Sequence, residues 1–264
     1  MKVFITDGTA AGFYTAVFLS YREKDAVITS QENRQLSFDT EVINVETDRE
    51  KAERVRARID GTDRYAAGDI DLALRSCDSL KENVCAEYIK LLIKSGRPVR
   101  KMLSHPTVIE ITEIIQRVTG ELHKMKGFLR FMETESGALY APYSPDNDIT
   151  DLIAPHFKAR LGGHKFAIHD VKRKKAALCD GTDWFMAEVG EAEVYLSEYE
   201  RSFEALWKKY YTSVNVKERP HEKQMKGYMP VRYWKFLPEN NGERDGECHF
   251  LTILLSLKSP WSAT

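Results

Sequence analysis

The most constraining feature of this 264-residue sequence is a series of short strand-like segments, separated by turn residues, in its second half. Ser136-Gly137 precedes one of these segments, and Asp180-Gly181 joins two others. Short apolar runs bounded by Gly, Asp and Ser are typical of strands and hairpins. The strands that we predict are residues 127–133, 138–143, 165–170, 176–179 and 183–189. Together they indicate an antiparallel sheet with helices on one side.

The N-terminal part has a different pattern, in which a strand leads directly into a helix. Residues 2–6 suit a short strand, and Asp7-Gly8 suits a tight turn rather than a phosphate-binding loop, because the glycine spacing matches neither nucleotide-binding pattern. The apolar residues that follow recur at helical spacing, and they are Ala10, Phe13, Tyr14, Val17, Phe18 and Tyr21. Capping boxes at Thr47, Ser79 and Ser197 begin further helices, of which Gly96 ends the second.

These patterns predict an α+β fold. We expect an N-terminal mixed α/β part with several helices in residues 1–105, followed by a C-terminal antiparallel sheet covered by helices in residues 106–239. The boundary falls in the segment from Gly96 to Pro106, which is rich in helix breakers and basic residues. Residues 240–264 form an atypical tail, which we expect to be poorly ordered despite its apolar residues 250–257.

Composition excludes several classes of protein. Aromatic residues reach 11%, which argues against a disordered chain, and no apolar stretch approaches the ~18 residues of a membrane span. The N-terminus lacks the pattern of a secretory signal, so we expect a cytoplasmic protein that does not bind membranes. Four cysteines without a C-x-x-C pair predict neither disulfides nor structural zinc, and no cofactor is predicted.

Charge is strongly segregated along the second half, although the net charge is only −1. Residues 156–175 carry seven Lys and Arg against one acid, residues 176–204 carry eight acids against one Arg, and residues 207–235 carry eight Lys and Arg against two acids. Aromatic residues interleave with the cations of the last stretch, a composition that suits stacked bases and backbone phosphates. A charged edge strand that blocks aggregation is the alternative interpretation of Lys172–Lys175.

These stretches predict a nucleic-acid-binding groove. Trp207 shares a helical stripe with Phe203, Leu206 and Tyr210, so we expect it to be buried in the core. Stacking on bases is assigned instead to Tyr233 or Trp234. The residues predicted to contact phosphates are Arg130, Lys172, Arg173, Lys174, Lys208, Lys209, Arg219, Arg232 and Lys235.

Five further side chains could carry chemistry, and they are Asp146, Asp148, His156, His169 and Asp170. Closely spaced carboxylates with a nearby His can hold a divalent metal, and a His beside an Asp can act as a general base. More ordinary interpretations are a turn cap at Asp146, a helix cap at Asp148 or Thr150, and a surface His at the end of a strand. No metal ligand is assigned, and a metal-dependent nuclease or lyase acting on DNA stays open as the alternative function.

Several segments in order resemble a bacterial family of DNA metabolism or DNA repair proteins. The segments are 3–9 (VFITDGT), 123–131 (HKMKGFLRF), 139–147 (LYAPYSPDN), 153–157 (IAPHF), 168–173 (IHDVKR) and 230–235 (PVRYWK). The resemblance implies a protein that acts with a radical S-adenosylmethionine (SAM) protein and is often fused to a domain similar to uracil-DNA glycosylase. Since this chain lacks the fused domain, it implies a glycosylase-like partner in trans, and DNA, single-stranded or damaged, as the ligand. It supplies no catalytic residues.

Overall fold

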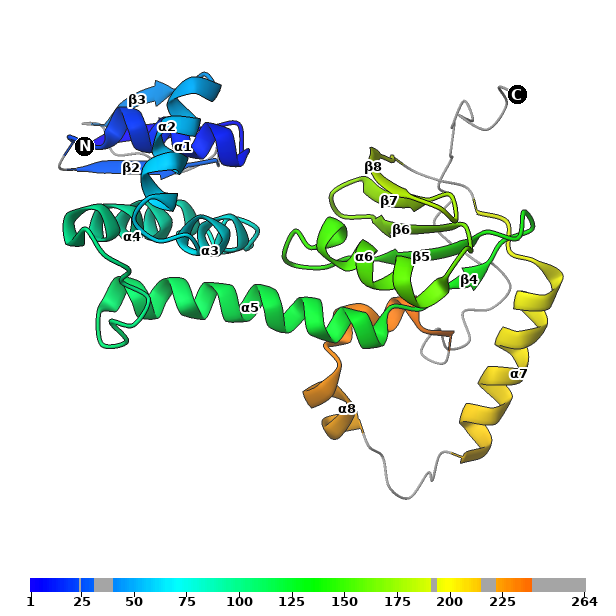
Figure 1. Ribbon diagram of the computed structural model, residues 1–264. Helices are drawn as coiled ribbons and strands as arrows, with labels where there is room; N and C mark the ends of the chain where they lie inside the picture. The colour runs from blue at the N-terminus through cyan, green and yellow to red at the C-terminus, as the bar shows by residue number, and fades with distance from the viewer. Residues whose placement is uncertain (24, 31–39, 191–193, 215–221, 239–264) are drawn as a thin grey trace, which may run out of the picture. The chain divides into compact units, whose positions relative to one another are not determined.

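The structure is a computed structural model that describes residues 1–23, 25–30, 40–190, 194–214 and 222–238 (Figure 1). The chain divides into two compact units, Met1–Glu121 with Asp146–Asp148, and Leu122–Pro145 with Ile149–Thr264. Arg219 and the predicted tail 240–264 lie outside the described residues. Within the described part of the chain, no helix is both long enough and apolar enough to cross a membrane.

The first unit contains a three-stranded parallel sheet and five helices, counted over its described residues (Figure 1). The strands β1 (Lys2–Ile5), β2 (Ala26–Thr29) and β3 (Glu41–Asn44) lie in the order β2-β1-β3. The helices are α1 (Ala10–Ser20), α2 (Arg49–Asp60), α3 (Ala66–Ala73), α4 (Lys81–Ser95) and α5 (Pro106–Phe128), the last of which continues into the second unit. The predicted strand at residues 2–6, the turn after it and the helix that follows are confirmed.

The core of this unit forms where α1 packs against α2 and the sheet. Phe13, Tyr14 and Val17 are buried in it, whereas Phe18 and Tyr21 at the end of the predicted stripe are 36% and 43% exposed. Cation–π contact with Arg54, at 5.2 Å from the ring centroid, covers part of Phe18. The buried side of α1 therefore differs from the predicted stripe, since it also includes Thr15, Ala16 and Ser20.

The helix starts follow the capping predictions only in part. Ser197 accepts a hydrogen bond from the Glu200 amide at 3.0 Å, as predicted. At α2 the capping residue is Asp48, which accepts from the Lys51 amide at 3.1 Å, because Thr47 donates its hydroxyl to Asp7 instead. Helix α4 begins at Lys81 without a side-chain cap, and it ends as predicted at Gly96, whose φ of 60° suits glycine.

The turn between β1 and α1 is held by the Asp7 carboxylate. It accepts hydrogen bonds from the Thr9 amide at 2.9 Å, the Thr9 hydroxyl at 2.7 Å and the Thr47 hydroxyl at 2.7 Å. Gly12 leaves room for this carboxylate, since a Cβ there would lie 2.2 Å from Asp7 Oδ1. The glycine is thus explained by close packing inside the unit.

We expect Gly12→Ala to lower the free energy of unfolding by about 1–3 kcal/mol, because the new methyl group displaces the Asp7 carboxylate from its hydrogen bonds. Gly68→Ala is the matched control, since a Cβ at this position in α3 meets no atom within 4 Å. The control should stabilise the helix by about 0.5–1 kcal/mol. Urea unfolding of both variants checks the prediction, and equal effects at the two positions would contradict it.

The second unit is built on a five-stranded mixed sheet (Figure 1). Its strands are β4 (Met132–Glu133), β5 (Leu139–Tyr143), β6 (Phe166–Asp170), β7 (Lys175–Cys179) and β8 (Trp184–Glu188), in sequence order across the sheet. The described part of this unit also contains the helices α6 (Thr150–Leu161), α7 (Glu198–Val214) and α8 (Glu222–Tyr228). Its last element is the 3-10 helix η1 (Val231–Phe236). The α+β class is confirmed.

Two details of the predicted sheet are wrong. Strands β5 and β6 are parallel, because α6 carries the chain back across the sheet between them, so the sheet is mixed rather than antiparallel. The strand predicted at residues 127–133 is only the two-residue β4, because α5 continues to Phe128. Met125 is buried on the same helical face as Val118, which extends the helical period into that segment.

The division between the units falls after Glu121, inside α5, and not at the predicted residue 105. The breaker-rich segment belongs to the first unit because Val99 is fully buried there. Val108 and Ile111, in the first turns of α5, pack in the same core. A segment rich in Gly and Pro therefore forms a turn within one core rather than a boundary between two.

Candidate nucleic-acid interface

Helix α7 is anchored to the second unit through its first turn. The buried Glu200 carboxylate accepts from Arg130 Nη2 at 2.8 Å and from the Glu133 amide at 3.1 Å. The Ser197 amide in turn donates to the Glu133 carbonyl at 3.0 Å. These hydrogen bonds fix the start of α7 beside β4, with the Glu200 side of the helix facing the sheet.

Beyond this turn, α7 exposes a row of apolar and aromatic side chains, which we call the α7 aromatic face. Phe203 and Trp207 stack with their ring centroids 6.4 Å apart and their planes at 16°, and Tyr210 lies 5.7 Å from Trp207. Its exposed members are Leu206 at 65%, Tyr210 at 55%, Val214 at 54% and Phe203 at 37%, while Trp207 is half-buried. Tyr199, in the first turn, is 70% exposed.

The prediction that this stripe is core is therefore wrong. The helical period was identified correctly, but α7 contacts β4, a strand of two residues that cannot cover a helix of seventeen. Figure 1 shows the helix extending away from the sheet. An amphipathic pattern identifies a face that avoids water and does not say which partner covers it.

Cations also lie on the second half of α7. Lys208 and Lys209 are exposed one and two positions after Trp207. Glu204 lies one turn before Lys208, and its pKa is raised by burial and by the neighbouring Glu200 carboxylate. The second half of the helix thus carries exposed aromatic rings and exposed ammonium groups, which point to different sides of the helix axis.

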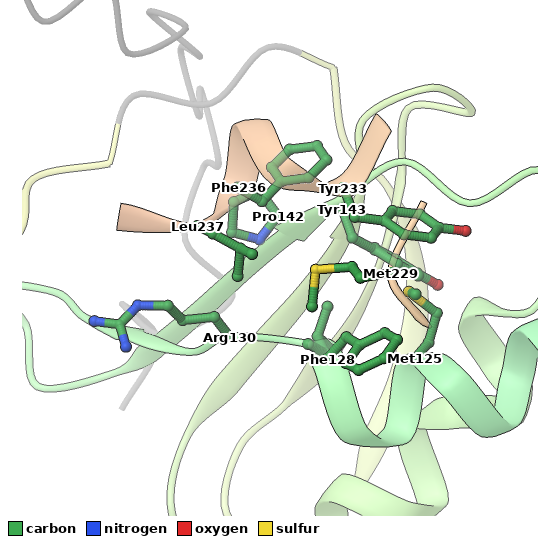
Figure 2. A pocket seen from close by; sticks show the side chains of 10 residues that line it. Met125, Phe128, Arg130, Pro142, Tyr143, Met229, Tyr233, Phe236 and Leu237 are labelled. Carbon is green, nitrogen blue, oxygen red and sulfur yellow. The ribbon is translucent and has the colours of Figure 1, made fainter. Parts of the chain in front are cut away.

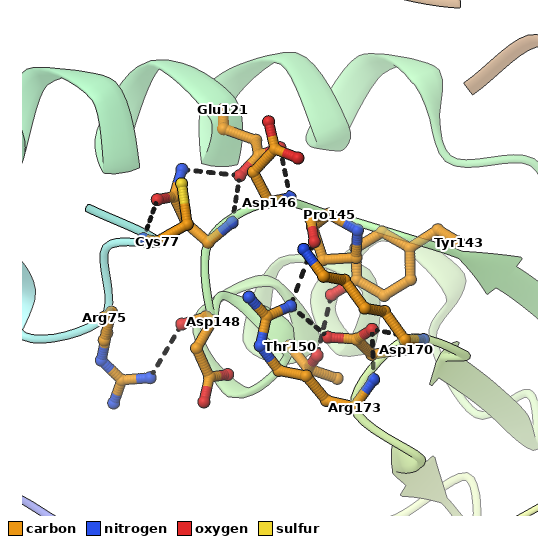
Figure 3. Close-up of polar contacts among 12 residues, drawn as sticks. Arg75, Cys77, Glu121, Tyr143, Pro145, Asp146, Asp148, Thr150, Asp170 and Arg173 are labelled. Atoms are coloured by element: carbon orange, nitrogen blue, oxygen red, sulfur yellow. Dashed lines mark hydrogen bonds and ion pairs between the residues drawn. The ribbon is translucent and has the colours of Figure 1, made fainter. Parts of the chain in front are cut away.

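A second cationic surface is the turn between β6 and β7, where Lys172 and Lys174 are exposed. Its shape is set by Asp170, whose fully buried carboxylate accepts from the Lys172 amide at 3.1 Å and the Arg173 amide at 3.2 Å (Figure 3). Arg173 Nη1 pairs with the same carboxylate at 2.8 Å and donates to the Pro145 carbonyl at 3.1 Å. Asp170 and Arg173 therefore hold the turn that presents the two lysines.

The remaining side chains predicted to contact phosphates differ in the contacts that they already make within the protein. Arg130 is paired with the buried Glu200, and its guanidinium lies 5.5 Å from the Phe203 ring centroid. Arg232 and Lys235 are exposed on η1, over the rings of Tyr233 and Phe236 respectively. Arg130 and Arg173 are thus engaged inside the unit, and the lysines are the better-placed candidates.

The two predicted stacking residues lie in a packed region. Tyr233 is 5% exposed, and Trp234 is half-buried with its Nε1 donating to the Met229 carbonyl at 3.2 Å. Tyr233 lines a small pocket between the end of α5, β5 and η1 (Figure 2). The other residues of that lining are Met125, Phe128, Leu129, Arg130, Pro142, Tyr143, Met229, Phe236 and Leu237. Tyr233 therefore fixes η1 against the sheet.

The candidates Asp146 and Asp148 belong to a loop of the first unit (Figure 3). The buried Glu121 carboxylate accepts from the Asp146 amide at 2.9 Å, the Asn147 amide at 2.8 Å and the Asn147 side chain at 2.7 Å. The Asp148 amide donates a hydrogen bond to the Arg75 carbonyl at 2.8 Å. Ile149, and neither Asp148 nor Thr150, occupies the capping position of α6, and no side chain bonds there.

His169 is buried, so the expectation of a surface His is wrong. Its strand β6 is central in the sheet, and the imidazole Nδ1 lies 2.7 Å from the Tyr140 hydroxyl of the neighbouring strand. Burial lowers the pKa of the imidazole, which keeps it neutral. His156 packs edge-on against Phe157 in α6. Over the described residues, no group of three or more His, Cys, Asp or Glu side chains could hold a metal ion.

Acidification should therefore destabilise the fold through His169. The unfolded chain binds a proton at this side chain with the ordinary pKa of 6.5 and the folded chain binds it less readily, so stability is lost as the pH falls below that value. The urea midpoint at pH 5.5 should drop less, relative to pH 7.5, in His169→Gln than in the parent chain. The exposed His164→Gln is the control and should leave the drop unchanged. An equal drop in all three proteins would contradict this origin.

Comparison with family models places residues 79–239 in a domain of unknown function, DUF4130. The match covers more than half of the chain, so the protein belongs to this family. It includes the whole five-stranded sheet, α7 and η1, and therefore every predicted site residue. A search of curated proteins finds no match.

Proposed function

We propose that the protein is a DNA-binding accessory protein of a DNA repair or base-modification system. The observation that carries the proposal is helix α7, which carries the stacked rings of Phe203 and Trp207, the neighbouring ring of Tyr210, and the exposed Lys208 and Lys209. Exposed aromatic rings stack on unpaired bases, and ammonium groups neutralise the phosphates between them. The chemistry favours single-stranded or damaged DNA, whose bases are free to stack.

The partners that we propose are a radical SAM protein and a uracil-DNA glycosylase-like protein acting in trans. Support for them comes from the sequence resemblance described above, while the DNA-binding face rests on the geometry of α7. In this arrangement the protein holds DNA and the partners supply the chemistry. Lys172 and Lys174 at the β6–β7 turn would extend the contact along the backbone.

A metal-dependent nuclease or lyase was the alternative hypothesis. Asp170 is engaged with Arg173 and two backbone amides, and His169 with Tyr140. These contacts give both side chains a structural role in the sheet. The geometry therefore favours the accessory role over the alternative.

Fluorescence anisotropy with a labelled single-stranded oligonucleotide tests the proposal. Affinity should fall steeply between low and physiological salt, with log K changing by about −0.7 per phosphate per unit of log salt. Lys208→Gln with Lys209→Gln should reduce that slope by about 1.4, because two phosphate contacts are lost. Duplex and uracil-containing oligonucleotides measured alongside give the strand and lesion preference.

Lys101→Gln with Lys124→Gln is the matched control, since both lysines are exposed and lie outside α7. This variant removes the same charge and should leave the slope unchanged. A flat salt response of the parent chain, or equal losses in the two variants, would overturn the proposal that α7 contacts the backbone.

A further inference from the structure

The five-stranded sheet has two edge strands, and they differ in how they are covered (Figure 1). At one edge, β4 has only two residues, and the segment that leads into α7 pairs beside it through a bridge between Thr134 and Leu196. At the other edge, β8 has five residues and pairs with β7 alone among the described strands. Proteins usually protect such edges with a lysine, a proline or a bulge, and β8, with the sequence WFMAE, has none of these. Within the described residues, β8 therefore offers an edge that a further strand can extend.

The backbone groups of β8 alternate between β7 and the outer side of the sheet. The amide of Val189, just after β8, donates to the Lys174 carbonyl at 2.8 Å, which sets the phase of the ladder. Residues an even number of positions before Val189 therefore bond to β7, and the others turn their amide and carbonyl groups outward. The outward-facing residues are Trp184, Met186 and Glu188. The Trp184 amide donates to the Asp183 carboxylate at 2.9 Å, and no described residue bonds to the outward groups of Met186 and Glu188.

Apolar side chains line this edge on both faces of the sheet. Phe185 is 47% exposed and Met186 is 38% exposed, while Trp184 is half-buried. Successive side chains of a strand point to opposite faces, so Phe185 lies on one face and Trp184 and Met186 lie on the other. A strand added to β8 would cover apolar surface on both faces and pair the outward backbone groups at the same time. The edge therefore favours a strand, and not a helix, as its occupant.

The sequence of β8 complements itself in one full-length antiparallel register. The outward-facing residues are spaced evenly around Met186, so a two-fold axis there places Met186 opposite its own copy and Trp184 opposite Glu188. Phe185 then lies opposite Ala187, which pairs a large side chain with a small one, and no charge lies opposite a like charge. A two-fold axis at Glu188 would instead oppose two carboxylates. In the register centred on Met186, two hydrogen bonds join the Met186 residues, and each Glu188 amide donates to the Trp184 carbonyl of the second copy.

We infer that a second copy of this chain binds β8 through its own β8 and continues the five-stranded sheet across a two-fold axis at Met186. The same surface is used by both copies, so the assembly closes as a dimer. Two five-residue strands form an interface at the low end of the specific range, so the dimer should be reversible and depend on protein concentration. The inference does not rest on the proposed function, because β8 contains no residue that is assigned to DNA.

Sedimentation velocity on the full chain, from low to high micromolar concentration, tests the dimer and its axis. Met186→Lys and Met186→Glu each place like charges opposite one another, so each variant alone should stay monomeric where the parent chain forms a dimer. An equal mixture of the two variants should recover the dimer, because the charges that meet at the axis are then opposite. Leu103→Lys is the matched control, since it places the same charge on another exposed apolar residue, in the first unit, and should leave the dimer unchanged.

Three results of this experiment would overturn the proposal. A parent chain that stays monomeric at high micromolar concentration would exclude the dimer. Dimers in both Met186 variants would place the contact on another surface. A mixture of the two variants that stays monomeric would exclude a two-fold axis at Met186.

Hydrogen exchange on the parent chain tests the same contact without a variant. In a monomer, the outward amides of Met186 and Glu188 should exchange fast, whereas the amides of Phe185 and Ala187, which bond to β7, should exchange slowly. Dimer formation at high concentration should slow exchange at Met186 and Glu188 by about tenfold or more. Exchange at these two amides that stays fast at every concentration would overturn the proposal. Protection that is independent of concentration in a monomeric protein would show another segment of the same chain on β8 and would also overturn it.

Discussion

Replacement of Asp170 by alanine should lower the free energy of unfolding by about 3–5 kcal/mol, the usual cost of breaking a buried ion pair from one side. The carboxylate is fully buried and accepts three hydrogen bonds, two from backbone amides and one from Arg173. Without it, the Arg173 guanidinium, only 23% exposed, keeps the Pro145 carbonyl but loses its ion pair with Asp170. The β6–β7 turn should then lose its shape, and Lys172 and Lys174 their fixed positions.

Asp183→Ala is the control for this prediction. The Asp183 side chain is 81% exposed and pairs with Lys158 at 2.9 Å, so its removal should cost less than about 1 kcal/mol. Denaturant unfolding monitored by circular dichroism compares the two variants. If Asp170→Ala costs no more than Asp183→Ala, Asp170 does not organise the turn.

The elements that local sequence determines were predictable. The β7–β8 hairpin joins where Asp180-Gly181 predicts it, Gly96 ends α4, and Ser197 caps α7. Each depends on residues a few positions apart, whose backbone preferences act independently of the rest of the chain. The parallel pairing of β5 with β6 depends instead on where α6 crosses the sheet, and no local pattern records that.

The roles of the candidate site residues were less predictable, for the same reason. His169 pairs with Tyr140, Asp146 with Glu121 and Arg130 with Glu200, and every one of these partners is distant in the sequence. The charge segregation and the aromatic stripe of α7 were visible in the sequence. Whether the stripe faces a core depends on the length of β4, which only the assembled sheet shows.

In the C-terminal part, the structure buries an aromatic residue predicted to stack on bases and exposes part of one predicted to lie in the core. Tyr233 is buried against the sheet, so Tyr233→Ala should destabilise the fold by about 3–5 kcal/mol and act on DNA binding only through folding. Trp207, half-buried between Phe203 and Tyr210, should cost about 1 kcal/mol or less of stability when replaced by alanine. The sequence alone had favoured the opposite assignment, with Trp207 in the core.

Trp207→Ala should instead weaken single-stranded DNA binding by about 1–3 kcal/mol, the range for loss of one stacking ring. Trp207→Phe retains an aromatic ring and should recover most of the affinity. If Trp207→Ala binds DNA as the parent chain does, stacking on Trp207 is excluded, and the exposed lysines would have to carry more of the interaction by charge.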